Sequence, residues 1–313
     1  MSEYLWDKSG EPDPEIEALE TLLLPLGAKP DKTFVFPRRT NWAAMAVAAS
    51  VLLLLGAGWF SFNRKQVGWH VSTLAGTAQA QTLTRGESLT TDAASRARLE
   101  LPSVGAVEVE PNSQLAVVAL GKFEQRLNLK RGKISAMIWA PPGQFVVNTP
   151  SATTVDLGCA YTLEVNDSGD ALVKVTAGWV AFDDNGRESF IPATAACVTR
   201  RGKGPGTPYY DDATSRLRTA VTRFDESGDM DAVAQIRGEA RPRDSITLWH
   251  LLRRVPPNER GPIFDRLAEL LKLPANVNRQ GVVRGDARMI DTLWDSLELG
   301  DTSWWRTWKT RTH

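Results

Sequence analysis

The sequence contains few of the residues that form metal sites. Its 313 residues include 3 histidines, and His70, His250 and His313 lie in separate regions. None of them belongs to a His-Glu-x-x-His motif, in which two histidines on one helix face bind zinc. We therefore expect no metal site and no other cofactor.

An excess of one charge is also absent. The 37 Lys and Arg residues equal the 37 Asp and Glu residues in number. Because binding to nucleic-acid phosphates requires a basic surface, this balance argues against direct nucleic-acid binding.

No catalytic motif is present either. The glycine-rich residues 202–206 contain Pro205, and the Gly-Lys-Ser/Thr of a phosphate-binding loop does not follow them. The pairs Asp183-Asp184 and Asp211-Asp212 occur in turn-like stretches, without a nucleophile or a set of metal ligands. We predict that the chain is not an enzyme and has no catalytic residues.

A long apolar run, in contrast, is present at residues 42–62. It has 21 consecutive positions without a charged side chain, and Trp42 and Trp59 lie near its ends. An α-helix of this length crosses roughly 30 Å of hydrocarbon, and indole rings favour the membrane interface. We predict one transmembrane helix in the lipid bilayer. The alternative is a buried helix in a soluble core.

The basic residues around this run predict its orientation. Four precede it and two follow it: Lys29, Lys32, Arg38, Arg39, then Arg64 and Lys65. Because basic residues near a membrane helix stay cytoplasmic, we expect residues 1–41 in the cytoplasm and the C-terminal bulk on the other side.

Residues 66–208 alternate between apolar and polar side chains, as half-buried strands do. The odd positions from Val155 to Val165 are mostly apolar and place Cys159 inward, and residues 166–170 then form a turn before a second apolar strand from Ala171 to Phe182. Further strands are predicted at residues 96–101, 106–109, 126–129 and 144–148. An approximate repeat places Gly86, Gly132 and Gly178 46 residues apart, which predicts stacked, similar β-units.

The order of these elements resembles the FecR-domain proteins over roughly residues 66–205. The resemblance depends on the glycine turn at Gly86 before a strand, the segment Val147-Asn-Thr-Pro150 and the later strand ending in Ala177-Gly178. It implies a periplasmic, β-rich regulatory or sensory domain beside a single helix of the inner membrane, with an unknown periplasmic ligand or protein as its input.

The two cysteines, Cys159 and Cys197, both fall in the part of the chain expected outside the cytoplasm. Disulfides persist in such compartments. We favour a disulfide between these residues, and two buried free thiols are the alternative.

The N-terminal arm contains a predicted amphipathic helix. It begins at Pro14, and Ile16, Leu19, Leu22 and Leu23 recur at spacings of three and four. An arm this short cannot bury such a stripe internally. The alternative to a partner is packing on itself or on lipid headgroups.

The same arm resembles the cytoplasmic anti-sigma arm of FecR-type regulators, whose short helices clasp an extracytoplasmic-function sigma factor. The resemblance implies that the contact residues are Tyr4, Leu5, Trp6, Ile16 and Leu19. The arm has no Cys and no His, so its binding fold must be free of metal.

Residues 209–313 change to helical spacing. Leu217, Ala220, Val221 and Phe224 fall on one face, and later apolar segments repeat this character between proline breaks. We predict an all-α bundle of four or five helices. We expect Trp249 and Trp294 in its core, and docking or an interface for Trp304, Trp305 and Trp308.

The predicted fold class is therefore a multidomain membrane protein. Its parts are a helical arm (1–41), one transmembrane helix (42–62), an all-β FecR-like domain of stacked short strands (66–208) and an all-α C-terminal bundle (209–313). The predicted function is a single-pass anti-sigma-like regulator of transcription. The alternative is a cell-envelope binding or scaffolding protein.

Overall fold

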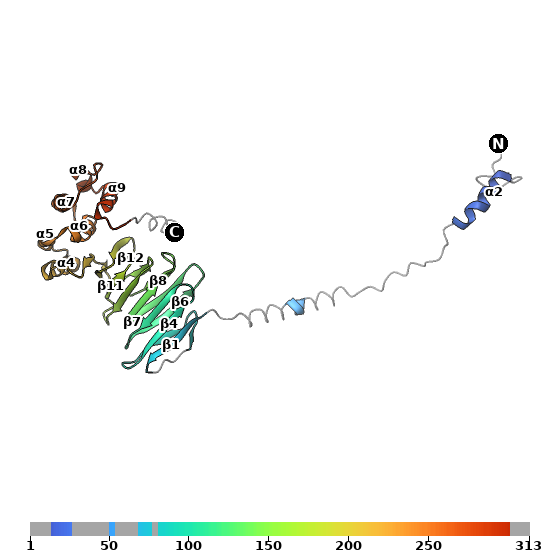
Figure 1. Ribbon diagram of the computed structural model, residues 1–313, viewed down its shortest axis with the longest axis horizontal. Coiled ribbons are helices and arrows are strands. Elements are labelled where there is room, and N and C mark those ends of the chain that lie inside the picture. Colours follow the sequence, from blue (N-terminus) through green and yellow to red (C-terminus); the bar gives the residue numbers. More distant parts are fainter. Residues whose placement is uncertain (1–13, 27–49, 54–67, 77–80, 301–313) are drawn as a thin grey trace. The chain divides into compact units, whose positions relative to one another are not determined.

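The computed structural model describes residues 14–26, 50–53, 68–76 and 81–300 (Figure 1). The chain divides into two units, residues 1–65 and 66–313. The first unit contains the helix α2 (Pro14–Leu23) and the 3-10 turn η1 (Leu24–Leu26). The predicted helix of the N-terminal arm is therefore present, with Pro14 at its first position.

The predicted transmembrane helix over residues 42–62 is corrected by the structure. Among the described residues, no helix has the length and apolar character needed to span a membrane. Of this segment the structure describes residues 50–53, which are helical and rise about 6 Å, against roughly 30 Å of hydrocarbon. The other positions of the predicted helix lie outside the described residues.

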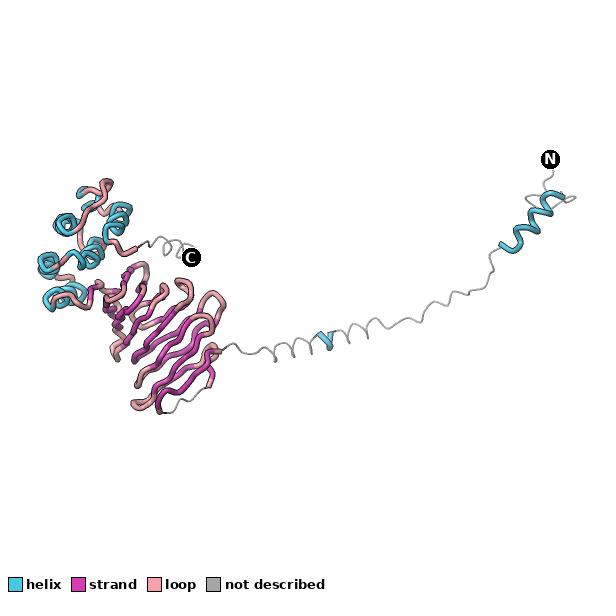
Figure 2. Tube along the Cα trace, in the orientation of Figure 1, coloured by secondary structure: helices cyan, strands magenta, loops and turns pink. Residues whose placement is uncertain are grey.

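The described residues of the second unit include a large β-structure of 16 strands. Figure 2 shows these strands in magenta. The strands are β1 (Trp69–Ala75), β2 (Thr82–Leu83), β3 (Ser88–Thr90), β4 (Arg96–Leu101), β5 (Gly105–Val109), β6 (Gln114–Leu120), β7 (Gln125–Ile138), β8 (Phe145–Asn148), β9 (Thr153–Asp156), β10 (Ala160–Val165), β11 (Ala171–Ala177), β12 (Trp179–Asp184), β13 (Arg187–Pro192), β14 (Ala195–Arg200), β15 (Gly204–Pro205) and β16 (Tyr209–Tyr210). All neighbours pair antiparallel except β7 and β8, which are parallel.

The long strand β7 joins two ladders of strands. Its first half pairs with β6 and β8, and its second half pairs with β5 and β10. Gly132 lies at the change, with φ +93°, and an added Cβ there would lie 2.3 Å from the Cα of Ser113. Only glycine has the space and the conformational freedom that this crossing requires.

The predicted glycine repeat coincides with such crossings. Gly86, Gly132 and Gly178 all have positive φ, at 88°, 93° and 70°. Gly86 lies between β2 and β3, and Gly178 lies between β11 and β12, and in both cases the two strands belong to different ladders. The three glycines therefore mark places where the chain passes from one ladder to the other.

The predicted strand from residue 155 to 165 is wrong as a single element. The chain turns at Gly158, with φ +84°, so β9 ends at Asp156 in one ladder and β10 begins at Ala160 in the other. The side chain of Asp156 accepts a hydrogen bond of 2.7 Å from the Gly158 N–H and stabilises this turn. The predicted inward direction of Cys159 is confirmed, because its side chain is buried.

Helices follow the last strands. They are α4 (Ser215–Ser227), α5 (Met230–Glu239), α6 (Ser245–Leu252), α7 (Pro257–Leu270), α8 (Arg279–Arg284) and α9 (Ala287–Thr292), with 3-10 turns η2 (Pro242–Asp244) and η3 (Leu293–Leu297). The predicted apolar face of α4 is confirmed: Leu217, Ala220, Val221 and Phe224 are buried. The strands and helices share one continuous hydrophobic core, and in Figure 1 the helices lie beside the β11 and β12 end of the strands.

Candidate functional site

The helix α2 exposes apolar side chains on one side. Leu19, Leu22 and Leu23 are 55%, 74% and 52% exposed, and Ile16 is half-buried. No residue of α2 is buried, and Glu15 and Glu17 in its first turn suit the positive end of the helix dipole. The helix therefore presents an apolar stripe that the described residues leave uncovered.

The predicted partner-binding residues are only partly described. Ile16 and Leu19 lie three positions apart in α2, which places them on the same side of the helix. Tyr4, Leu5 and Trp6 lie outside the described residues. The structure therefore places two of the five predicted contact residues and leaves their partner open.

The predicted disulfide does not form in the structure. Cys159 and Cys197 are both free and buried. The thiol of Cys159 donates to Oδ2 of Asp156 at 2.6 Å, and the thiol of Cys197 donates to the carbonyl oxygen of Gly206 at 3.1 Å. Because each thiol has its own acceptor in a different place, the alternative of two buried thiols describes the structure.

Asp156 is a buried carboxyl group beside Cys159. Its side chain is 1% exposed, and this burial raises the pKa of Asp156 to about 7, although hydrogen bonds from Cys159 and Gly158 oppose the rise. The nearby hydroxyl of Tyr161 is buried and has no hydrogen-bond partner among the described residues. Because this pKa of Asp156 lies near neutral pH, the carboxyl group makes the stability of the fold depend on pH.

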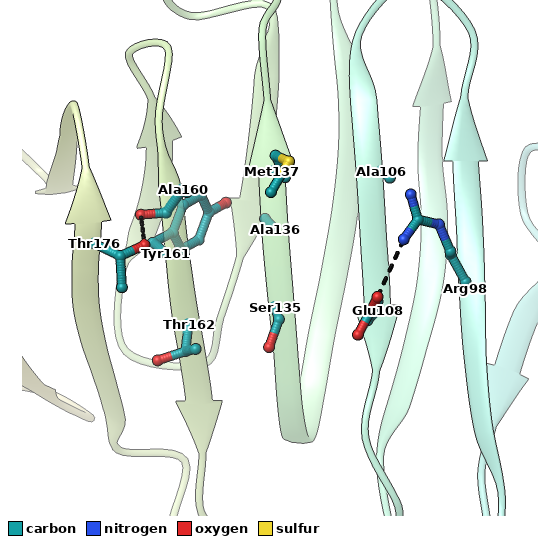
Figure 3. Close-up of a pocket in the computed structure, with 10 residues that line it drawn as sticks. All are labelled: Arg98, Ala106, Glu108, Ser135, Ala136, Met137, Ala160, Tyr161, Thr162 and Thr176. Atoms are coloured by element: carbon teal, nitrogen blue, oxygen red, sulfur yellow. Dashed lines mark hydrogen bonds and ion pairs between the residues drawn. The ribbon is translucent and has the colours of Figure 1, made fainter. Parts of the chain in front are cut away.

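A shallow hollow of about 240 Å³ lies over the strands β4, β5, β7, β10 and β11 (Figure 3). Met137, which lines it, is 61% exposed. The charges at its border are paired, since Arg98 contacts Glu100 at 2.5 Å and Glu108 at 3.1 Å. The hollow offers an apolar floor with neutralised charges and no group suited to chemistry.

A buried ion pair lies where the strands meet the helices. Arg254, which follows α6, and Asp225 of α4 are 3.9 Å apart and only 5% and 6% exposed. Arg254 also donates to the hydroxyl groups of Thr207 and Ser189, at 2.7 Å each, and to the carbonyl oxygen of Glu188 at 3.0 Å. Arg254 therefore ties a helix to both β13 and the segment before β16.

The carboxylate of Asp225 completes this network. It accepts the Thr207 N–H at 2.6 Å and the Thr207 hydroxyl at 2.8 Å. Burial lowers the pKa of Arg254 to about 10, the Asp225 charge opposes the lowering, and Arg187 adds to it. Because buried charges cost free energy unless they are paired and hydrogen-bonded, the network holds the strands and helices in one arrangement.

His250 of α6 makes a second contact to the strands. Its Nε2 accepts the N–H of Phe190 at 3.0 Å, so its proton is on Nδ1, which donates to the carbonyl oxygen of Ile246 at 2.8 Å. The side chain is 2% exposed, and burial lowers the pKa of His250 well below its usual range, with Arg254 adding to this effect. The imidazole is therefore neutral in the folded protein.

Aromatic side chains from strands and helices pack together at the same junction. The centre of the Trp294 ring lies 4.8 Å from the ring centre of Trp249 and 5.7 Å from the ring centres of both Phe190 and Trp179. Trp249 and Trp294 are 2% and 3% exposed, which confirms their predicted core position. Trp304, Trp305 and Trp308 lie outside the described residues.

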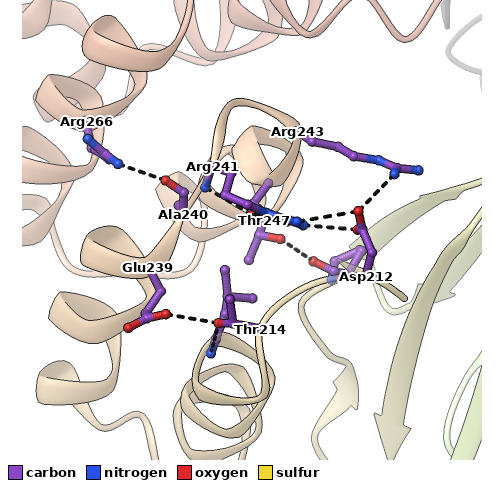
Figure 4. Close-up of polar contacts among 11 residues, drawn as sticks. Asp212, Thr214, Glu239, Ala240, Arg241, Arg243, Thr247 and Arg266 are labelled. Carbon is purple, nitrogen blue, oxygen red and sulfur yellow. Dashed lines mark hydrogen bonds and ion pairs between the residues drawn. The ribbon is translucent and has the colours of Figure 1, made fainter.

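Exposed ion pairs border the junction (Figure 4). Asp212 accepts from Arg241 at 3.0 Å and from Arg243 at 3.1 Å, and Arg243 also donates to the hydroxyl of Thr194 at 2.5 Å. The Arg243 guanidinium lies 4.2 Å from the ring centre of Tyr210. The end of the β-structure is therefore fixed to the segment before α6.

The charged and polar residues of the junction were not found from the sequence. Asp225 follows the buried Phe224 in α4, and Arg254 follows a fully buried helix. The one available signal is the apolar run Ser245–Leu252, within which His250 is an isolated titratable group. A charged residue at a helix end is ordinarily solvated, so spacing alone does not separate Arg254 from its exposed neighbours.

Comparison with known proteins finds a family model that matches part of the β-structure. Residues 87–181, which is less than half of the chain, match the family model described as FecR protein. This match confirms the predicted resemblance over these residues. No curated protein matches the sequence.

Two crystal structures of a candidate anti-sigma factor from Parabacteroides distasonis ATCC 8503, at 1.65 Å and 2.50 Å resolution, are similar to this chain. The identity is 14% and the TM-score 0.35 in both cases, and the similarity covers 44% of this chain. The chain spans 65% and 64% of the length of those structures. At this TM-score they carry no argument about the partner of this chain.

Proposed function

We propose that this chain, whose residues 87–181 match the FecR protein family, is a regulator that binds a sigma factor through α2. The observation that carries the proposal is the apolar stripe of α2, on which Leu19 and Leu22 are 55% and 74% exposed. Burying each leucine against a partner contributes about 1.5 to 3 kcal/mol. An amphipathic helix of this kind binds in a hydrophobic groove of its partner.

The finer parts of the proposal come from the sequence. They are an extracytoplasmic-function sigma factor as the partner, Tyr4, Leu5 and Trp6 as further contacts, and a periplasmic ligand or protein as the input. The inner-membrane location, with residues 1–41 cytoplasmic and the bulk periplasmic, also stays a prediction. The boundary between the β-domain and the helical domain at residue 208 also stays a prediction.

The test is co-purification of the tagged full chain from its native host, with mass spectrometry of the captured proteins. The double variant Ile16→Asp/Leu19→Asp places two charges on the apolar stripe and should lose the sigma factor. Thr21→Asp adds a charge on the other side of α2, where Thr21 is exposed, and should retain it.

A sigma factor captured equally by the wild type and the double variant removes α2 as the binding surface. Capture of envelope proteins without any sigma factor supports the alternative of an envelope scaffold. Because α2 has no buried residue, the double variant does not disturb the packed core of residues 68–300.

A further inference from the structure

A polar hollow of about 400 Å³ opens beside the junction of strands and helices. Its walls come from two elements that lie far apart in the sequence. The turn between β12 and β13 supplies Gly186, the start of β13 supplies Arg187 and Glu188, and the C-terminal end of α6 supplies Trp249 and, directly after it, Arg253 and Arg254. A ligand in this hollow touches the strands and the helices at once.

Three guanidinium groups and the carboxylate of Glu188 line the hollow, and two of the guanidinium groups form ion pairs with carboxylates from other elements. Arg254 pairs with Asp225, and Arg253 pairs with Asp291 while its guanidinium lies 4.9 Å from the Trp249 ring centre. Both groups are therefore fixed in position before any ligand arrives.

Arg187 differs from the other two arginines. Its Nε donates to the carbonyl oxygen of Pro205 at 2.8 Å, and it makes no ion pair with any residue in the described ranges 14–26, 50–53, 68–76 and 81–300. The Nε bond fixes the plane of the guanidinium and leaves its two terminal nitrogens for other acceptors. The positive charge of Arg187 is felt at Arg254, since it lowers the pKa of Arg254.

We infer that the hollow beside Arg187 is a binding site for a small oxyanion, a carboxylate or phosphate group, that bridges the β12–β13 turn and α6. The two terminal nitrogens of the Arg187 guanidinium can donate two parallel hydrogen bonds to such a group. The inference goes beyond the proposed function and does not rest on it, because the site lies in the second unit and α2 lies in the first.

A bound oxyanion has a structural consequence. It joins the turn that follows β12 to the helix α6, and so adds a contact to the junction held by Arg254 and His250. A ligand that binds the folded state alone raises the melting temperature, and the stabilisation grows with the logarithm of the ligand concentration once that concentration exceeds Kd. Binding of an anionic ligand should therefore stabilise the junction between the strands and the helices.

The experiment is a titration of the full chain with inorganic phosphate and, separately, with succinate, at constant ionic strength. Binding is measured by calorimetry and by the shift in melting temperature. The Arg187→Gln variant should bind about tenfold more weakly than wild type, because charge-assisted hydrogen bonds are lost. Arg187→Lys, which keeps the charge but not the fork, should fall between the two.

The control is Arg216→Gln, at an arginine whose side chain is 77% exposed and lies outside the hollow. It should bind as wild type does. Binding of phosphate alone assigns a phosphoryl ligand, and binding of succinate alone assigns a carboxylate. The inference is overturned if neither probe binds wild type, or if Arg187→Gln binds with wild-type affinity.

Discussion

The backbone N–H of Phe190 donates a hydrogen bond of 3.0 Å to Nε2 of His250, a residue 60 positions later in the chain. This bond joins β13 to α6 and requires a neutral imidazole. A protonated imidazole presents an N–H to the Phe190 N–H and cannot accept from it. The contact between the strands and the helices therefore depends on the charge of one buried side chain.

The first prediction concerns acid. The pKa of His250 is lowered by burial, so the unfolded chain binds a proton there that the folded chain does not. Stability should therefore fall as the pH drops below about 6.5, the usual histidine value. His250→Gln retains an acceptor for Phe190 but does not titrate, so its stability should fall less between pH 7 and pH 5. Urea unfolding at several pH values measures the difference, and equal slopes for both proteins contradict the prediction.

A second prediction has the opposite sign. Burial raises the pKa of Asp156 to about 7, so the folded chain retains a proton that the unfolded chain loses near pH 4. The stability that this proton provides is complete below pH 4 and is lost as the pH rises toward 7. Relative to wild type, Asp156→Asn should therefore gain about 2 to 4 kcal/mol between pH 4 and pH 8. Chemical unfolding at both pH values provides the test, and a constant difference argues against it.

The third prediction concerns the buried ion pair. Asp225→Asn keeps the side-chain volume but leaves Arg254 as a buried charge without a counter-charge, which should lower the free energy of unfolding by about 3 kcal/mol. The matched control is Asp265→Asn, because Asp265 and Arg279 form a pair whose side chains are 50% and 54% exposed. That change should cost less than about 1 kcal/mol. Similar losses in both variants mean that the buried pair has no special role.

A fourth prediction distinguishes two costs of replacing a glycine, the clash of an added Cβ and the strain of a positive φ. Gly86 and Gly132 have φ of +88° and +93°, yet a Cβ at Gly86 meets nothing within 4 Å, whereas one at Gly132 lies 2.3 Å from Ser113. Gly86→Ala should therefore cost about 1 to 2 kcal/mol from backbone strain alone. Gly132→Ala should cost clearly more, because the strands at the crossing must separate. Thermal unfolding of both variants measures the difference. Equal losses of stability contradict a close contact between Gly132 and Ser113.

Much of the β-structure could be predicted because burial alternates regularly. The strand predicted at residues 96–101 is β4 itself, and that at 144–148 differs from β8 by one residue. The break at Gly158 was missed since the alternation continues through it: the odd positions from Val155 to Val165 are buried in both ladders. A period of two reports burial and does not report which ladder a residue joins.

The helical part shows a similar limit. The face of α4 was predicted from its spacing, whereas α5 and α8 were missed. The junction could not be predicted, since Asp225, Arg254 and His250 come together only through tertiary packing. The prediction of a transmembrane helix was wrong for another reason. Hydropathy indicates the solvent that a segment prefers but not whether it forms one long helix, and no described helix has the length that a membrane span requires.

The measurement that tests the central claim most directly is the affinity of the purified full chain for the sigma factor captured from its host. Wild type, Leu19→Asp and Thr21→Asp are compared by calorimetry. We expect Leu19→Asp to bind at least about tenfold more weakly, because the contact of an exposed leucine with the partner is replaced by a charge, and Thr21→Asp to bind as wild type does. Equal affinity of wild type and Leu19→Asp, or the capture of no sigma factor by the wild-type chain, contradicts the account.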